Sequence, residues 1–279
     1  MDESKLSKDR LAVLEKMRLY EAEGKLNEAV EADPPAPELL PEKFDYLCKK
    51  LSSRFKRKIA NFIADRYFLN LIKKGVLMID GVTGAEHLSV LKNGAVLTCN
   101  HFSPMDNYIV FHCIRKYLPY KYLYKVIREG NYTNFPGLYG FFFRHCNTLP
   151  LSSNKRTMIN FMSATDALLK KGESILIYPE QEMWWNYRKP RPYKIGAFRI
   201  AYKAGAPVLP TFITMQDSDI IGPDGAPLQR HTLHIMPPVY PEEGLSIKEG
   251  ATKMMDATFA AVKAKYEEVY GVPLTYGEE

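Results

Sequence analysis

A chain of 279 residues, of which 46% are hydrophobic and 25% charged, is long enough to bury one substantial core with or without a smaller appendage. Its four cysteines form no CxxC pair, which indicates reduced thiols and excludes a disulfide framework. The sequence has no run of about eighteen apolar residues that would predict a transmembrane helix, and its acidic, polar start is not a secretory signal. We therefore expect a cytoplasmic protein that is soluble or lies peripherally on the inner face of a membrane.

The net charge of +6 is concentrated in one part of an N-terminal region, residues 1–74, that we expect to be entirely helical. Apolar residues at helical spacing predict a first helix within residues 4–30, and the proline-rich segment 32–42 predicts a stiff linker. Residues 44–74 then contain nine Lys and Arg against two Asp, a net charge of +7. This positive charge does not recur as a groove-lining pattern, so no nucleic-acid partner is expected.

The basic segment 44–74 predicts a helix because its apolar residues recur at helical spacing. These residues are Phe55, Ile59, Phe62, Ile63, Tyr67, Phe68 and Leu71. A basic, aromatic-rich amphipathic helix suits an anionic membrane surface, where each nearby Lys or Arg adds about 1 kcal/mol of attraction. A helix packed on the core with lysines on its solvent face explains the pattern equally well, so both interpretations stay open.

Residues 75–279 show a different pattern, in which strands and helices alternate. Short β-branched runs bounded by glycine or turn residues predict strands at 76–82, 95–100, 147–151, 174–179, 207–213 and 231–239. Helical spacing predicts helices at 104–117, 154–171, 194–204 and 249–270. This order predicts an α/β domain with a largely parallel central sheet flanked by helices, in which ligands bind at the carboxyl ends of the strands.

The strand predicted at 95–100 ends on Asn100, and His101 follows at once. Residues 103–106 have the composition of a helix start, with Ser103 as the N-cap and Asp106 at the third helical position. Asp106 is therefore either a structural capping residue or the carboxylate that orients His101 as a general base. No Gly-x-Ser-x-Gly motif supplies a protein nucleophile, so such a base would act on a hydroxyl of the substrate.

The strand predicted at 174–179 ends on Tyr178 and Pro179, and Glu180 follows. The loop that comes next contains Trp184, Trp185, Tyr187, Arg188, Lys189, Arg191 and Lys194. Basic side chains at strand ends favour phosphate, which predicts a binding loop; a solvated loop pinned by its two tryptophans is the alternative. The histidines show neither HxxxH nor HExxH spacing, so no metal site is expected.

Together these residues resemble the motifs of the glycerolipid acyltransferase superfamily, which includes lysophosphatidate and glycerol-3-phosphate acyltransferases. Its Asn-His-x4-Asp motif is matched by Asn100, His101 and Asp106, and its aromatic-Pro-Glu-Gly motif by residues 178–180. A short apolar strand with two prolines after a glycine is a further motif, and GAPVLP at 205–210 matches it. The resemblance covers residues 75–240, and the motifs follow one another in the order found in the family.

The resemblance implies a glycerol-phosphate-acyltransferase-like fold and an O-acyltransferase reaction without an acyl-enzyme. His101 is expected to act as a general base on an acceptor hydroxyl, and Asp106 to orient it. The acyl donor would be acyl-CoA or an acyl carrier protein, used as a co-substrate with no other cofactor. The leading acceptor is the lysophospholipid 1-acyl-sn-glycerol-3-phosphate, which would become phosphatidic acid in phospholipid biosynthesis. The expected substrate-binding residues are Asn100, Glu180, Gln181, Arg156, Arg188 and Lys194.

Two departures from the family pattern leave the acceptor open. Gln181 stands where the family has a glycine, and Ser152 and Ser153 stand where a phosphate-binding arginine is expected. The basic residues that would then hold the phosphate are Arg156, Arg188 and Lys194, with Lys125 and Arg144 as weaker candidates. The alternative functions are an acyltransferase for another lyso-lipid or polar acceptor, a His/Asp hydrolase of lipids or thioesters, and a non-enzymatic membrane-binding module.

Overall fold

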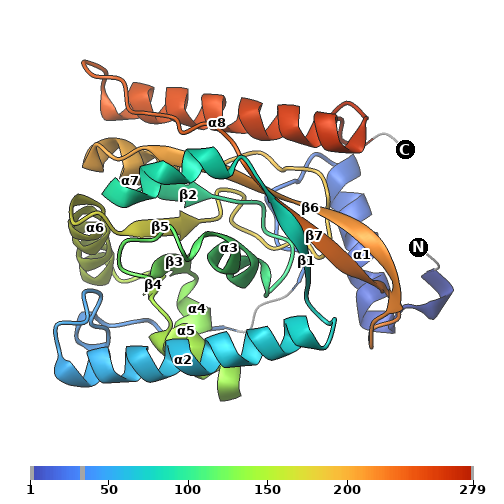
Figure 1. Cartoon of the computed structure of the whole chain (residues 1–279), viewed down its shortest axis with the longest axis horizontal. Helices are drawn as coiled ribbons and strands as arrows, with labels where there is room; N and C mark the ends of the chain where they lie inside the picture. Colours follow the sequence, from blue (N-terminus) through green and yellow to red (C-terminus); the bar gives the residue numbers. More distant parts are fainter. Residues whose placement is uncertain (1–2, 32–34, 278–279) are drawn as a thin grey trace.

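The computed structural model describes residues 3–31 and 35–277, so part of the linker predicted at 32–42 lies outside the described residues. Its centre is a seven-stranded sheet in the order β1-β7-β6-β2-β5-β3-β4 (Figure 1). The strands are β1 (Met78–Thr83), β2 (Val96–Thr98), β3 (Leu123–Ile127), β4 (Thr148–Pro150), β5 (Ser174–Ile177), β6 (Val208–Ile221) and β7 (Pro227–Ile235). Neighbouring strands run parallel except β6 and β7, which form an antiparallel hairpin. The predicted, largely parallel central sheet is confirmed.

Helices cover both faces of the sheet (Figure 1). One face carries α2 (Leu51–Lys73), α3 (Asp106–Ile114) and α5 (Gly137–His145), and the other carries α6 (Lys155–Lys170), α7 (Gly196–Ala204) and α8 (Ile247–Tyr270). The remaining helices are α1 (Lys8–Ala22), α4 (Glu129–Thr133) and the 3-10 helices η1 (Glu3–Lys5), η2 (Pro41–Lys43) and η3 (Ala85–Asn93). The residues of β2 are buried on both faces of the sheet, which explains why Val96 and Leu97, on opposite faces, are both apolar.

Several elements differ from the predicted ones. The sequence pattern predicts nothing between residues 118 and 146, where the structure has β3, α4 and α5. The strand β3 is missed because Lys125 interrupts its short apolar run. The first helix is shorter than predicted, because Gly24 adopts a φ of 69° and turns the chain soon after α1 ends at Ala22. The strand β6 extends eight residues beyond the end of the strand predicted at 207–213, and β7 has the predicted length but starts and ends four residues earlier than 231–239.

Both helices of the N-terminal region contact the α/β fold. Phe68 of α2 stacks on Tyr108 of α3, with ring centroids 4.4 Å apart. Met17 of α1 packs in a cluster with Trp184, which belongs to the loop after β5. The N-terminal region is thus helical, whereas the domain boundary predicted at residue 74 stays a prediction. None of the helices within residues 3–31 and 35–277 is long and apolar enough to span a membrane.

Candidate active site

His101 and Asp106 lie at the carboxyl ends of β2 and β5, two neighbouring parallel strands inside the sheet. The Nδ1 atom of His101 is 2.7 Å from Oδ2 of Asp106. The Asp106 side chain is fully buried, whereas the His101 side chain keeps 23% of its surface exposed. A carboxylate at Nδ1 favours the tautomer in which Nδ1 carries the proton and Nε2 a lone pair. No described residue hydrogen-bonds to Nε2, so this atom can accept a proton from a bound hydroxyl.

Three further hydrogen bonds fix the Asp106 carboxylate. Oδ2 accepts from the backbone N–H groups of Phe102 at 3.2 Å and Ser103 at 3.3 Å, and Oδ1 accepts from the Tyr178 hydroxyl at 2.5 Å. The predicted cap is wrong in its detail, because α3 begins at Asp106 itself and has no side-chain cap. The same carboxylate closes the turn before α3 and holds His101, so its structural and catalytic interpretations are compatible.

Tyr178 connects the end of β5 to this pair. Its ring stacks on the imidazole of His101, with centroids 4.1 Å apart and an interplanar angle of 16°. Burial and the neighbouring carboxylate of Asp106 raise the pKa of Tyr178 well above its ordinary value, so the hydroxyl stays protonated and donates. The sequence predicts Tyr178 only as the aromatic position of a motif, and the role of its hydroxyl comes from the structure.

Asn100 and Glu180, both predicted to bind substrate, are buried and hold the backbone of the site. Asn100 joins the end of β2 to β6, because Nδ2 donates to the Ile213 carbonyl at 3.0 Å and Oδ1 accepts the Ile213 N–H at 2.8 Å. Oε2 of Glu180 accepts the backbone N–H of His101 at 3.2 Å. These contacts position His101 from both neighbouring strands, and contact of Asn100 or Glu180 with substrate stays a prediction.

Glu180 is paired with Arg191, a fully buried arginine whose role the sequence did not indicate. Nη2 of Arg191 lies 2.9 Å from Oε2 of Glu180, and the backbone N–H of Arg191 donates to Oε1 at 3.0 Å. The guanidinium also donates to the Leu26 carbonyl at 3.1 Å and lies 4.8 Å from the ring centre of Trp184. A buried charge is stable only with such partners. The pair therefore fixes the loop after β5 and, through Glu180, the backbone of His101.

The chain is similar to known acyltransferases. A family model described as Acyltransferase matches residues 81–214, which contain His101, Asp106 and Glu180. Over 177 residues the chain is 29% identical to the 1-acyl-sn-glycerol-3-phosphate acyltransferase BAT2, chloroplastic, of Brassica napus, a match that covers 63% of this chain and 48% of the plant protein. Together the family model and the plant relative support the glycerolipid acyltransferase superfamily for this chain. The match spans about half the length of the plant protein.

The fold is also that of a solved member of the superfamily. The crystal structure of the 1-acyl-sn-glycerophosphate acyltransferase PlsC from Thermotoga maritima matches with a TM-score of 0.53 and 18% sequence identity. This match covers 95% of this chain and 96% of the bacterial one. The glycerol-phosphate-acyltransferase-like fold expected from the resemblance is therefore confirmed.

The basic and aromatic loop after β5 is not an open binding surface. Trp184 is fully buried, and Trp185 is buried beneath Arg10, whose guanidinium lies 4.5 Å from its ring centre. Arg188 forms an ion pair of 2.6 Å with Asp217 of β6. The loop pinned by its tryptophans is thus the arrangement that the structure has. A phosphate could reach Arg188 only in competition with Asp217.

Ser152 and Ser153, which replace the arginine expected from the family pattern, are both bonded to Glu129. The Glu129 carboxylate accepts from the Ser152 hydroxyl at 2.7 Å, the Ser153 hydroxyl at 2.9 Å and the backbone N–H of Leu39 at 2.6 Å. Partial burial acts to raise the pKa of Glu129, but these hydrogen bonds outweigh it and hold the pKa below its ordinary value. A carboxylate therefore neighbours the position of the missing arginine, and a phosphate must be bound by other residues.

The other predicted substrate-binding residues are exposed near the strand ends that carry His101 and Asp106. They are Arg156, Gln181 and Lys194. Arg156 lies in the first turn of α6, which follows β4, and Lys194 lies just before α7. The backbone N–H of Lys194 donates to the carbonyl of Pro179, the residue before Glu180, at 2.8 Å. Neither Arg156 nor Lys194 forms an ion pair with a described residue. Gln181 follows Glu180 with a φ of 67°, in the left-handed region.

Three further basic residues occupy different positions. Arg128 directly follows β3, at the same end of the strands as His101, and no sequence motif indicated it. Its guanidinium forms an ion pair of 3.0 Å with Glu182. Lys125 lies inside β3, where burial lowers its pKa. Arg144 lies in α5 and donates to the Phe135 carbonyl at 3.0 Å. Arg128 is therefore a better placed candidate for an anionic substrate than Lys125 or Arg144.

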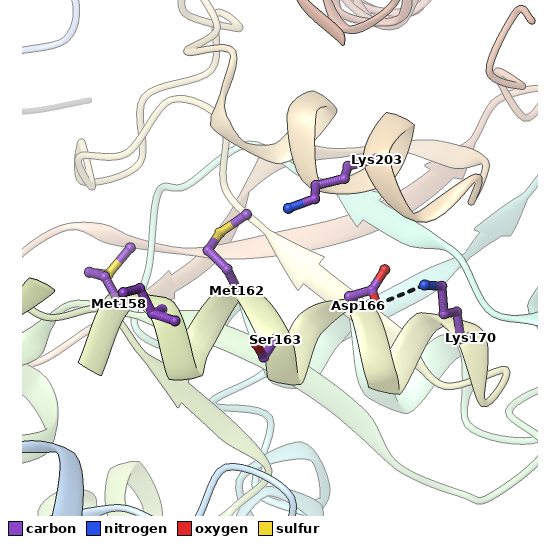
Figure 2. A pocket seen from close by; sticks show the side chains of 7 residues that line it. Met158, Met162, Ser163, Asp166, Lys170 and Lys203 are labelled. Carbon is purple, nitrogen blue, oxygen red and sulfur yellow. Dashed lines mark hydrogen bonds and ion pairs between the residues drawn. The ribbon is translucent and has the colours of Figure 1, made fainter. Parts of the chain in front are cut away.

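A hollow of about 520 Å³ opens between α6 and α7 (Figure 2). Its lining residues are Met158, Ile159, Met162, Ser163, Asp166, Lys170 and Lys203. Figure 2 shows the ion pair of Asp166 and Lys170 along α6, with Lys203 extending from α7. Neither residue of the His101–Asp106 pair lines this hollow, so we assign it no part in the chemistry. No group of three or more His, Cys, Asp or Glu in the described part of the chain could hold a metal ion.

Proposed function

We propose that the protein transfers a fatty acyl chain from an acyl thioester to a hydroxyl of a glycerolipid. The observation that carries this proposal is the His101–Asp106 pair at the strand ends, in which Nε2 of His101 has no hydrogen-bond partner among the described residues. The donor is acyl-CoA or an acyl carrier protein. The leading acceptor is 1-acyl-sn-glycerol-3-phosphate, which appears in the name of the plant relative, and the product is then phosphatidic acid for phospholipid biosynthesis.

In this reaction His101 first accepts a proton from the acceptor hydroxyl and then donates it to the leaving group. Nε2 takes the proton of the acceptor hydroxyl, and the oxygen forms a bond to the thioester carbonyl carbon. The tetrahedral intermediate collapses by breaking the carbon–sulfur bond, and the departing thiolate receives the proton from Nε2. The carboxylate of Asp106 stabilises the imidazolium between these steps.

Direct transfer is favoured over an acyl-enzyme, because no serine or cysteine of residues 3–31 and 35–277 hydrogen-bonds to the imidazole of His101. Cys99 lies two residues before His101, but it is fully buried. Burial raises the pKa of its thiol, so a thiolate nucleophile does not form there.

The acceptor phosphate is proposed to bind Arg156 and Lys194. Both are exposed, form no ion pair within the described residues and lie near the strand ends that carry His101 and Asp106. Replacing either by glutamine should raise KM for a phosphate-bearing acceptor by about tenfold, the effect of one charge-assisted hydrogen bond. KM for the acyl donor serves as the internal control. Because Glu129 neighbours the missing arginine, an acceptor without a free phosphate is the second candidate.

We also propose that the protein docks peripherally on the anionic inner face of a membrane through α2. Leu51, Phe55 and Phe62 of this helix are 80%, 66% and 62% exposed. Helical spacing places them on one stripe, and nearby basic residues add attraction to anionic lipid. The double variant L51S/F62S should reduce binding to anionic vesicles. The control variant Leu19→Ser removes an exposed leucine from α1 and should leave vesicle binding unchanged.

The acyltransferase proposal is tested by mass spectrometry of products. The protein is incubated with acyl-CoA or acyl carrier protein and, in turn, with glycerol-3-phosphate and a panel of lyso-lipids. The wild type should acylate one acceptor, and His101→Ala should lose about 10²–10⁴-fold in rate with an unchanged melting temperature. Release of free fatty acid without an acceptor would instead show a hydrolase. A folded His101→Ala that transfers at the wild-type rate would contradict the assignment of the base.

A further inference from the structure

A second hollow, of about 400 Å³, opens at the N-terminal end of α2. It is lined by Leu47, Cys48, Arg54, Arg57, Tyr124, Ala167, Leu168 and Lys171. Tyr124 lies near the start of β3, and Lys171 precedes β5. The hollow is therefore at the amino-terminal ends of the parallel strands, whereas His101 is at their carboxyl ends. Figure 1 shows the start of α2 on the side of the molecule where α6 lies. The acyl-transfer site does not account for this feature.

The lining carries three cations, Arg54, Arg57 and Lys171, and no carboxylate. Neither arginine forms an ion pair with a described residue. Lys171 pairs at 3.3 Å with Glu173, whose side chain is buried. Asp45 lies before α2, but its two oxygens accept the backbone N–H groups that precede the helix, both at 2.9 Å. The hollow is therefore positive because of its side chains, while the N-terminus of α2 and the C-terminus of α6, which both lie at it, have opposing helix dipoles.

Arg57 is held in place with donors left unused. Its guanidinium lies 4.7 Å from the ring centre of Tyr122, and Nη1 donates to the Tyr124 hydroxyl at 3.0 Å. Its Nε atom is buried and has no hydrogen-bond partner among the described residues. Arg54 is oriented by a hydrogen bond of 3.0 Å from Nε to the Cys48 carbonyl. Two oriented guanidinium groups offer the planar donor pairs that match phosphate oxygens.

The hollow also adjoins the exposed apolar stripe of α2. Leu51 and Phe55 are one turn apart on this stripe, and helical spacing places Arg54 beside Leu51, whereas Arg57 lies on the opposite side of the helix, against Tyr122 and Tyr124. A phosphate held by Arg54 would leave attached acyl chains beside Leu51, where the stripe begins. A soluble phosphate ester would make no use of this apolar surface, so the adjacency favours a lipid.

We propose that this hollow binds the phosphate of an anionic phospholipid head group. It gives α2 a specific lipid site in addition to the general attraction of a basic helix to the membrane. The proposal rests on the membrane docking proposed above and is independent of the acyl-transfer chemistry at His101.

The test compares two double variants that remove the same charge from α2. R54Q/R57Q changes the hollow, and K56Q/K58Q removes two exposed lysines that do not line it. Binding is measured with phosphatidylcholine vesicles that either contain phosphatidic acid or lack it. On the vesicles with phosphatidic acid, R54Q/R57Q should lose about tenfold more affinity than K56Q/K58Q. On pure phosphatidylcholine, both variants should bind like the wild type.

Equal losses in the two double variants would show diffuse attraction only and overturn the proposal. Inorganic phosphate at millimolar concentration should compete weakly, and complete displacement of the protein by it would assign the hollow to free phosphate instead. Because Arg57 packs between two tyrosines, the melting temperature is measured for each variant. If R54Q/R57Q unfolds, the single variants Arg54→Gln and Lys171→Gln, whose residues are exposed, provide the same comparison.

Failure of the membrane docking itself gives a different result. The double variant L51S/F55S removes apolar contact and should weaken binding to both kinds of vesicle. If it binds both like the wild type, docking through α2 is wrong whatever the arginine variants show. If it weakens both while R54Q/R57Q and K56Q/K58Q behave alike, docking stands and the head-group site is wrong.

Discussion

The carboxylate of Asp106 accepts hydrogen bonds from two backbone N–H groups, the Tyr178 hydroxyl and the imidazole of His101. A buried charge with so many partners is held rigidly, and the cost of its burial is offset by charge-assisted hydrogen bonds. Tyr178 is distinctive because it contacts both members of the pair, through its hydroxyl at Asp106 and its ring at His101. Its two contacts can be separated by substitution.

Tyr178→Phe keeps the ring on His101 and removes the hydroxyl from Asp106. We expect kcat to fall by about tenfold with KM nearly unchanged, because the lost hydrogen bond orients the base rather than the substrate. Steady-state kinetics with the acceptor that the product assay identifies measure this effect. Tyr193→Phe is the matched control, because the buried Tyr193 hydroxyl has no hydrogen-bond partner among the described residues. A wild-type kcat for Tyr178→Phe would show that the hydroxyl does not position the pair.

Gln181 offers a second prediction at this scale, because its φ of 67° is unfavourable for a residue with a Cβ atom. Gln181→Gly should raise the free energy of unfolding by up to about 1 kcal/mol, the relief of strain less the greater entropy of glycine in the unfolded chain. Gln181→Ala keeps the strain and loses the amide, so it should not gain stability. If both variants raise KM equally, the Gln181 side chain contacts substrate, as expected from its place after Glu180. Chemical denaturation and kinetics separate the two effects.

Among the elements, the loop after β5 is held between the N-terminal segment and the strand end that carries the base. Nε1 of Trp184 donates to the Glu28 carbonyl at 2.9 Å, and its backbone N–H donates to the His101 carbonyl at 3.1 Å. Asn186 makes a similar backbone hydrogen bond to Phe102, also at 3.1 Å. The segment after α1 thus supports the backbone of His101 through this loop.

Trp184→Ala should therefore cost stability and activity together. Removing a fully buried tryptophan lowers the free energy of unfolding by about 3–5 kcal/mol. Trp184→Phe keeps most of the ring volume and loses only the hydrogen bond to Glu28, so it should cost about 1 kcal/mol. Urea denaturation measures both values, and protease digestion should cut the loop faster in Trp184→Ala. Digestion at the wild-type rate would show that the N-terminal segment does not restrain the loop.

The differences between prediction and structure follow from the distance over which each contact acts along the chain. His101 and Asp106 are five residues apart, so their spacing at a strand end suggested the pair as one of two interpretations of Asp106. Arg191 contacts Leu26 from 165 residues away, and a basic residue in a loop gives no local signal of burial. Glu129 bonds Leu39 across 90 residues for the same reason. The parallel sheet was predictable because buried strands have an apolar composition that does not depend on their neighbours.

In the whole molecule, the proposed acyl-transfer site and the cationic hollow lie at opposite ends of the strands. The His101–Asp106 pair lies at the carboxyl ends of β2 and β5, and the cationic hollow beside α2 lies at the amino-terminal ends of β3 and β5. α2 has 23 residues and is therefore about 35 Å long, enough to extend along much of one side of the molecule. Its exposed stripe can then set the orientation of both ends relative to a membrane.

Stability of the whole molecule should fall as the pH drops below about 6.5. Burial lowers the pKa of four histidines below the ordinary value: His112, His145, His231 and His234. Between the ordinary pKa and these lowered values, the unfolded chain binds protons that the folded chain does not, so acid favours unfolding. Each such histidine can contribute up to about 1.4 kcal/mol per pH unit within that window.

Glu173 opposes this trend, because burial raises the pKa of its carboxyl and the folded state takes up that proton first. One carboxyl does not balance four histidines, so the free energy of unfolding from urea titrations should decrease between about pH 7 and pH 5.5. His234→Gln removes one of the titrations, since His234 lies between the hydroxyls of Thr83 and Thr214, both at 2.8 Å from its ring nitrogens. The free energy of unfolding of His234→Gln should depend less steeply on pH than that of the wild type. A wild-type stability that is constant over this range would show that these histidines are protonated in the folded protein as readily as in the unfolded chain.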